Sequence, residues 1–215
     1  MSQYILAIDT AREYGSMALA RGEEIVEEVL IHAPDGFAQV LYGELAGLLA
    51  RNGVKLWEIN CFAAASGPGS FTGVRIGLAC VKGLAEVMHK PAAAVSNLQA
   101  LAWFGTAPLR AVVTDARRGE VYGALYDATG RLVEPEMVAK VADWIKTLPD
   151  VPLEFVAQDF SPYDGAFQGT QVVAPPALAG AIARITLAIL RRGAAQDPAA
   201  LEANYVCRPD AEMSL

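Results

Sequence analysis

The stretch that most constrains the fold of this chain runs from Ala64 to Leu78 and reads AASGPGSFTGVRIGL. The apolar run at 61–65 predicts a buried strand, and the Gly-Pro-Gly sequence that follows Ser66 ends it in a tight turn. Ser70 can cap a helix running to about residue 90, because its hydroxyl accepts from an early backbone N–H. The sequence therefore predicts a strand, a glycine turn and a helix whose N-terminus faces the turn.

One interpretation of this turn is an anion site. A helix N-terminus after a glycine turn presents free N–H groups, so Gly67, Gly69 and Ser70 are candidate contacts for a nucleotide or phosphate. The spacing fits neither the Walker pattern nor the dinucleotide pattern G-x-G-x-x-G.

The alternative is that the glycines serve packing. Gly69, Gly73 and Gly77 recur every fourth residue and so lie on one helix face. Glycine inside a helix costs roughly 0.5–1 kcal/mol relative to alanine, and close approach of another backbone would explain that cost. Packing is therefore favoured over phosphate binding, and we expect this face to meet a helix of another subunit.

Length and composition predict one compact α/β body of two lobes. The chain has 215 residues, of which 53% are hydrophobic, so a sizeable core can form. The net charge of −7 excludes a broad basic surface, and any RNA ligand would need another subunit to supply most of the positive charge.

The cysteines and apolar stretches predict a soluble cytoplasmic protein. Cys61, Cys80 and Cys207 form no metal-ligand pair, and their odd number favours a reducing compartment. The N-terminus enters a strand pattern without a leader, and the apolar stretch at 177–190 is too short for a membrane span and contains Arg184.

The same order of elements occurs twice: a strand ending in an acid, a hairpin, a third strand, a helix, a strand and a helix. We therefore expect duplicated lobes at 1–106 and 107–215, with the last helix packing back on the first lobe. The first half predicts strands at 4–8, 15–20, 25–31, 61–65 and 91–95 and helices at 35–51, 70–90 and 97–104, the last capped by Asn97. The second half predicts strands at 111–116, 121–126, 131–135 and 154–157, helices at 137–148 and 177–192, and a surface loop at 159–169.

Two acids end corresponding strands. If the lobes met there, Asp9 and Asp115 would face each other across a cleft, which suits an Mg²⁺-nucleotide or an acid/base pair. The alternative is that each carboxylate caps its own turn, as Asp9 could do together with Thr10.

The sequence gives little indication of a metal site or a catalytic nucleophile. His32 and His89 have no partner at metal-ligand spacing on a helix, and a G-x-S-x-G nucleophile elbow is absent. Arg117 and Arg118 form a small basic spot in a hairpin turn, either solvated or in contact with an anion.

Two helices carry wide apolar stripes. Stripes at this spacing usually face a core, but they also suit a helix-to-helix interface with a partner. The first stripe comprises Phe37, Leu41, Tyr42, Leu45, Leu48 and Leu49, and the second Phe71, Val74, Leu78 and Val81.

Three motifs together carry a family resemblance. The segments at 5–11, 66–78 and 115–122 read ILAIDTA, SGPGSFTGVRIGL and DARRGEVY, and they resemble the bacterial TsaB (YeaZ) family. The segment at 205–209 resembles that family's ending, with Cys207 as an insertion. Phe37-Ala38 stands where the family commonly has a His-Ser pair, so any polar contact of that pair is not transferred.

The resemblance implies the actin/hsp70/sugar-kinase fold and a role in making threonylcarbamoyladenosine beside the anticodon of certain tRNAs. It implies a non-catalytic subunit whose TsaD-like paralogue holds the catalytic metal, with a TsaE-like ATPase joining the complex. The chain would pair with TsaD or with itself, tRNA would be reached only through the complex, and ATP or ADP with Mg²⁺ would belong to the assembled complex.

The resemblance also implies an interface on the helices of the first lobe. Its expected residues are Phe37, Leu41, Tyr42, Leu45, Phe71, Gly73, Val74, Arg75, Gly77, Leu78 and Val81. A nucleotide or anion contact, if present, would use Asp9, Thr10, Gly67, Gly69, Ser70 and Asp115. The alternative functions are a small-molecule kinase of the same fold, using the two aspartates, and a metallopeptidase-like protein, for which metal ligands are lacking.

Overall fold

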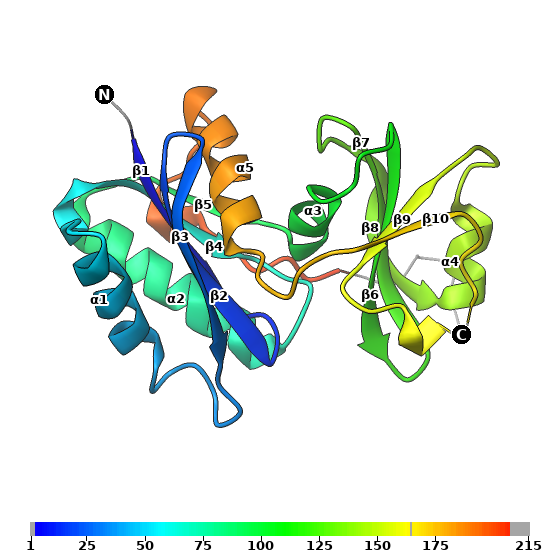
Figure 1. Ribbon diagram of the computed structural model, residues 1–215, viewed down its shortest axis with the longest axis horizontal. Coiled ribbons are helices and arrows are strands. Elements are labelled where there is room, and N and C mark those ends of the chain that lie inside the picture. The colour runs from blue at the N-terminus through cyan, green and yellow to red at the C-terminus, as the bar shows by residue number, and fades with distance from the viewer. Residues whose placement is uncertain (1–2, 164, 207–215) are drawn as a thin grey trace. The chain divides into compact units, whose positions relative to one another are not determined.

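The computed structural model describes residues 3–163 and 165–206. Cys207 and the rest of the family-like ending therefore lie outside the described residues. The chain forms two compact units, each with its own sheet (Figure 1). Of the described residues, the first unit contains those up to Asn97 together with Pro176–Asn204, and the second contains Leu98–Pro175 with Tyr205 and Val206.

The first unit is built on a five-stranded mixed sheet of order β3-β2-β1-β4-β5. The first three strands form an antiparallel meander, while β4 runs parallel to β1 and β5 runs parallel to β4. Its strands are β1 (Tyr4–Asp9), β2 (Tyr14–Arg21), β3 (Glu24–His32), β4 (Ile59–Ala65) and β5 (Ala92–Val95).

Helices cover both faces of this sheet (Figure 1). The apolar faces of α1 (Leu41–Arg51) and α2 (Phe71–Met88) join one core with Leu6 and Ile8 of β1, both fully buried. On the opposite face lies α5 (Ala179–Arg191), which contacts β1 and β2. A strand covered on both sides must be apolar throughout, which explains the continuous apolar run in β1. Short helices are α3 (Asn97–Ala102), η1 (Leu56–Glu58) and η3 (Pro198–Ala200).

The second unit repeats this topology. Its five-stranded sheet has the order β10-β9-β6-β7-β8, an antiparallel meander extended by two parallel strands. The duplicated α/β lobes predicted from the sequence are thereby confirmed. Its elements are β6 (Leu109–Arg117), β7 (Glu120–Asp127), β8 (Leu132–Lys140), α4 (Val141–Thr147), β9 (Glu154–Ala157), η2 (Ser161–Tyr163) and β10 (Thr170–Val173).

An aromatic cluster forms the core of the second unit. Trp144 of α4 lies flat against Gly123 of β7, where a Cβ would collide with the indole. Tyr163 and Phe167 are also buried, and Phe167 stacks on Phe155 with ring centroids 4.9 Å apart. The prediction of a surface loop at 159–169 is therefore wrong for these two side chains, which anchor the segment to the core.

Two predicted helix starts are wrong, and one strand was missed. The first helix begins at Leu41 rather than near residue 35, because turns occupy the preceding residues and Gly36 has a φ of 97°. Residues 137–140 belong to β8 and not to a helix, since Met137 and Val138 pair with β7. The strand β10 was not predicted, because its four residues are mostly exposed and show no alternation.

The helix α5 is held by side chains far away in the sequence. Ser16 of β2 is fully buried, and its hydroxyl oxygen accepts from the backbone N–H groups of Leu178 and Ala179 at 3.1 and 3.0 Å. Glu28 of β3 accepts from the N–H of Gly180 at 2.7 Å. These N–H groups have no acceptor within their own helix, so β2 and β3 together supply its cap, and the carboxylate complements the positive end of the helix dipole.

None of the helices in the described part of the chain combines the length and apolarity that a membrane crossing requires.

Replacing Ser16 by alanine tests the importance of this remote cap. Because two buried N–H groups would lose their acceptor, we expect Ser16→Ala to lower the free energy of unfolding by about 1–3 kcal/mol, measured by urea denaturation. Ser161→Ala is the control: its hydroxyl donates only to Asp159 at the exposed surface, where water can replace it, so the loss should be smaller, below about 1 kcal/mol. An equally small loss for Ser16→Ala would contradict the capping role.

Candidate functional site

The glycine turn has the predicted local structure. β4 ends at Ala65, and α2 begins at Phe71 with Ser70 as its N-cap. The Ser70 hydroxyl accepts from the N–H of Gly73 at 3.3 Å. The prediction of a strand, a turn and a capped helix is therefore confirmed.

Two of the three N–H groups expected to bind an anion already have partners. Gly67 N–H donates to the side-chain oxygen of Asn97 at 2.9 Å, and Ser70 N–H donates to the carbonyl of Ala11 at 2.7 Å. Asn204 N–H donates to the carbonyl of Ser66 at 2.8 Å, so the chain returns to this turn near its end. The geometry of Gly67 and Ser70 therefore gives no support to the expected anion cradle.

The glycine face of α2 meets the protein's own first loop. A Cβ on Gly73 would collide with the carbonyl oxygen of Thr10, and one on Gly77 would lie 2.5 Å from the Thr10 hydroxyl. A Cβ on Gly69 would lie 2.5 Å from the carbonyl oxygen of Ala11. The glycines therefore serve close packing, as predicted. They pack against Thr10 and Ala11 of the same chain, and not against a helix of another subunit as expected.

Thr10 also fixes this contact by a hydrogen bond. Its hydroxyl donates to the carbonyl of Gly73 at 2.8 Å, and Thr10 is 2% exposed. Thr10 is therefore a packing residue between β1 and α2.

Asp9 is buried and hydrogen-bonded within the first unit. It is 1% exposed, and its Oδ1 accepts from Ala11 N–H at 2.9 Å and from the side-chain amide of Asn97 at 3.2 Å. Burial raises the pKa of Asp9 above its ordinary value, while these hydrogen bonds and the charge of Arg12 oppose the rise. Asp9 thus closes its own turn.

Asp115 does the same in the second unit. Its Oδ1 accepts from the N–H of Arg117 at 2.8 Å, and the residue is exposed. The two aspartates belong to different units, and the local contacts of each are those of a turn-closing carboxylate.

Asn97 has a role that the sequence did not reveal. It was predicted to cap its own helix, but its side chain instead joins Gly67 to Asp9 and is fully buried. Its position directly after β5, a strand parallel to β4, is the signal that could have indicated a tertiary role, since the carboxyl ends of parallel strands share one edge.

The exposed part of the helix stripes is small. Tyr42 is 60% exposed and Phe71 is 59% exposed, and the guanidinium of Arg75 lies 3.4 Å from the centre of the Phe71 ring. Tyr42 of α1 lies near Cys80 of α2, and the two helices share one hydrophobic core. We call Tyr42, Phe71 and Arg75 the exposed triplet.

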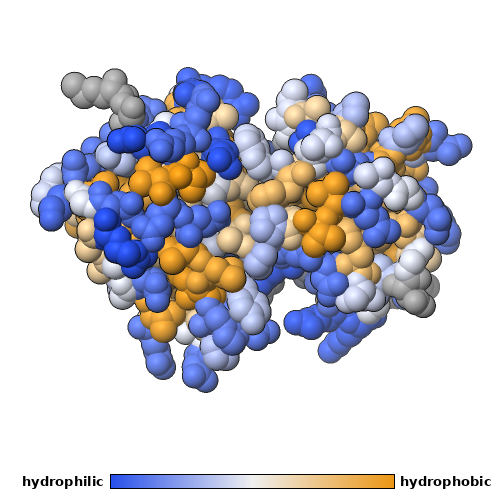
Figure 2. Space-filling view, viewed as in Figure 1, coloured by the Kyte–Doolittle hydropathy of each residue, from blue (hydrophilic) through white to orange (hydrophobic). Residues whose placement is uncertain are grey.

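The other residues expected at the interface are buried within the first unit. They support the fold, and little of their surface is exposed for a partner to contact. These residues are Phe37, Leu41, Leu45, Gly73, Val74, Gly77, Leu78 and Val81. Figure 2 shows that hydrophobic areas on the visible face of the first unit are separated by hydrophilic residues.

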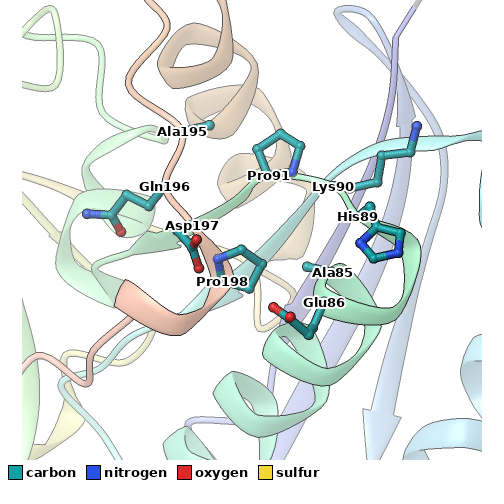
Figure 3. Close-up of a pocket in the computed structure, with 9 residues that line it drawn as sticks. All are labelled: Ala85, Glu86, His89, Lys90, Pro91, Ala195, Gln196, Asp197 and Pro198. Carbon is teal, nitrogen blue, oxygen red and sulfur yellow. The ribbon is translucent and has the colours of Figure 1, made fainter.

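A cavity of about 380 Å³ lies at the C-terminal end of α2 (Figure 3). Its walls include Glu86, His89, Lys90 and Asp197, so both signs of charge are present, and Lys90 points away from the two acids in the view. The Asp197 carboxylate already accepts from the N–H of Ala199 at 2.8 Å. The cavity therefore shows no converging set of ligand groups.

The described residues offer little for metal or thiol chemistry. They contain no group of three His, Cys, Asp or Glu side chains that could hold a metal ion. Cys61 and Cys80 are buried and unbridged, and burial raises the pKa of Cys61 to about 12, which keeps its thiol protonated and unreactive.

Comparisons with known proteins decide the family. The family model described as TsaD, tRNA N6-adenosine threonylcarbamoyltransferase, matches residues 32–192. The tRNA threonylcarbamoyladenosine biosynthesis protein TsaB of Bacillus subtilis is 34% identical over 164 residues, which are 73% of this chain and 72% of that protein. The chain belongs to the TsaB/YeaZ family. TsaB of Escherichia coli is 36% identical over 148 residues, 62% of this chain and 64% of that protein.

Solved structures of the TsaB/YeaZ family confirm the fold. YeaZ from Pseudomonas aeruginosa superimposes with a TM-score of 0.82 at 27% identity, over 95% of this chain and 100% of that one. The ethanolamine utilization protein EutJ of Carboxydothermus hydrogenoformans has a TM-score of 0.52 at 11% identity over 87% of this chain and 91% of that one, a likeness of fold alone. The expected actin/sugar-kinase-like fold and the family resemblance are both confirmed.

Two glycines of α2 provide a matched test of the glycine face. Gly73→Ala would force its Cβ onto the Thr10 carbonyl, so we expect a loss of at least about 2 kcal/mol in the free energy of unfolding. Gly83→Ala meets nothing within 4 Å, and should raise it by about 0.5–1 kcal/mol. Urea denaturation of both variants measures the difference, and a stable Gly73→Ala variant would contradict the contact.

Asp9→Asn tests the cost of the buried carboxylate. Because the pKa of Asp9 is raised in the folded state, the native protein binds the proton more tightly than the unfolded chain, and wild-type stability falls as pH rises through that pKa. The side chain of the Asp9→Asn variant cannot ionise, so the stability of the variant does not fall for this reason. We expect its stability relative to wild type to increase as the pH rises above about 4, the ordinary pKa of an aspartate, measured by urea denaturation. A difference independent of pH would contradict the buried charge.

Proposed function

We propose that this chain is a non-catalytic subunit in the threonylcarbamoyladenosine modification of tRNA, and that it binds and activates a TsaD-like partner. The observation that carries the proposal is the 34% identity to a protein named for this pathway over most of the chain. The match of residues 32–192 to the TsaD family model supports a partner of related fold, because related subunits often pair through similar elements.

The exposed triplet is the proposed centre of the contact with the partner. Aromatic residues and arginine are the side chains that most often dominate interface energies, and here they are presented by two adjoining helices. The same surface would serve a homodimer when the partner is absent, and a TsaE-like ATPase would join the assembled complex. We place this role in the cytoplasm.

The kinase-like alternative receives no support from the site. Asp9 is occupied by Ala11 and Asn97, and the N–H groups of Gly67 and Ser70 are used within the fold. A phosphotransferase would need these groups to be available for nucleotide phosphates.

Substitutions in the exposed triplet test partner binding. We expect Phe71→Ala combined with Arg75→Glu to weaken binding to a TsaD-like partner at least about thirtyfold, because hot-spot residues contribute about 2 kcal/mol or more. Titration calorimetry with the purified partner measures the change, and the unfolding midpoint should remain within a few degrees of wild type.

Val87→Ala is the matched control, since Val87 is also on α2 and is 69% exposed. It should leave the affinity unchanged. Val74 is unsuitable as a test position because it is 5% exposed and its replacement would disturb the core. Unchanged affinity in the double variant would rule out the proposed contact.

A further inference from the structure

The tip of the β6–β7 hairpin has an unusual backbone. Arg118 and Gly119 form a two-residue turn with φ of 55° and 75°, as hairpin turns of the primed type require. Just before it, the register shifts between Asp115 and Arg117, and Arg117 also has a positive φ, of 72°. Three consecutive residues therefore adopt the left-handed region, and two of them are arginines.

Arginine is a poor choice for these backbone positions. Its Cβ crowds the following carbonyl when φ is positive, whereas glycine has no Cβ and asparagine tolerates this region well. Glycine or asparagine at positions 117 and 118 would fold the same hairpin with less strain. Strained residues that persist commonly serve function, so the two guanidinium groups need a use of their own.

The guanidinium groups reach solvent despite nearby acids. The Arg117 side chain is 89% exposed, and its Nη1 lies 3.9 Å from Oδ2 of Asp115, whose other oxygen accepts the Arg117 N–H. Arg118 is exposed as well. Glu120, the acid that follows the turn, stands opposite Lys140 of β8 in the register, so its negative charge faces a positive one.

We propose that Arg117 and Arg118 contact the phosphate backbone of tRNA in the assembled complex, which rests on the function proposed above. Arginine binds phosphate through paired N–H donors, and two neighbouring exposed arginines suit a polyanion better than an enclosed small molecule. The net charge of −7 means that most of the affinity comes from another subunit, and this hairpin adds a local contact.

The test measures tRNA binding by the complex of this chain with its TsaD-like partner. Labelled tRNA is titrated by fluorescence anisotropy between about 50 and 200 mM salt. Arg117→Asn combined with Arg118→Asn removes both charges and keeps the left-handed backbone. We expect affinity to fall roughly tenfold to fiftyfold in about 0.1 M salt, and the slope of log affinity against log salt to become shallower by about 1.4 to 1.8.

A second readout separates the contact from a structural role. Because asparagine relieves the backbone strain, the thermal midpoint of the variant should not fall, although binding weakens. Arg131→Asn is the matched control: Arg131 is an exposed arginine at the other hairpin turn of the same unit, and its replacement should leave affinity and slope unchanged.

Three outcomes overturn the proposal. Unchanged affinity and slope in a double variant that still binds the partner would refute the hairpin contact and leave the proposed function standing. Competition of ATP with tRNA at the wild-type hairpin, lost in the double variant, would assign the arginines to a nucleotide instead. Failure of the wild-type chain to form a complex that binds tRNA would refute the proposed function itself.

Discussion

The contact between Thr10 and Gly73 is the constraint on which the first unit depends. The loop after β1 lies so close to α2 that only a hydrogen atom fits at Gly73, and the Thr10 hydroxyl binds the Gly73 carbonyl across the same gap. This approach sets the position of α2 on the sheet, and with it the glycine turn that leads into the helix. A side chain at Gly77 would separate the same two elements.

Tight internal packing also determines where the first unit can act. The polar groups at the carboxyl ends of β1 and β4 satisfy one another, with Asn97 bridging Asp9 and Gly67. In related folds such an edge of the sheet is where ligands enter. Here the groups are used to hold the turn, and exposed aromatic side chains lie instead on the helices, such as Phe71 and Tyr42.

Local chemistry made some features predictable from the sequence, and tertiary contacts hid others. The turn before α2 and the cap by Ser70 were predictable because neighbouring residues determine both. The spacing of glycines showed that a backbone approaches closely, but spacing alone does not say which chain supplies it. The role of Asn97 and the extension of β8 to Lys140 were missed because long-range partners, not local propensity, decide them. The sequence also could not show which residues of an apolar stripe are exposed. Phe71 and Val74 belong to one stripe, but only Phe71 is exposed in the packed structure.

The remote cap of α5 has a consequence for the order of folding during synthesis. Ser16 and Leu178 are 162 residues apart in sequence, and the whole of Leu98–Pro175 is made between the two parts of the first unit. On the ribosome, the sheet of the second unit, whose strands lie between Leu109 and Val173, can therefore complete its hydrogen bonds while the sheet beginning at Tyr4 still lacks the helix that covers one face. The first sheet to emerge waits longest for its cover, and its uncovered apolar face is what a chaperone would meet in the interval.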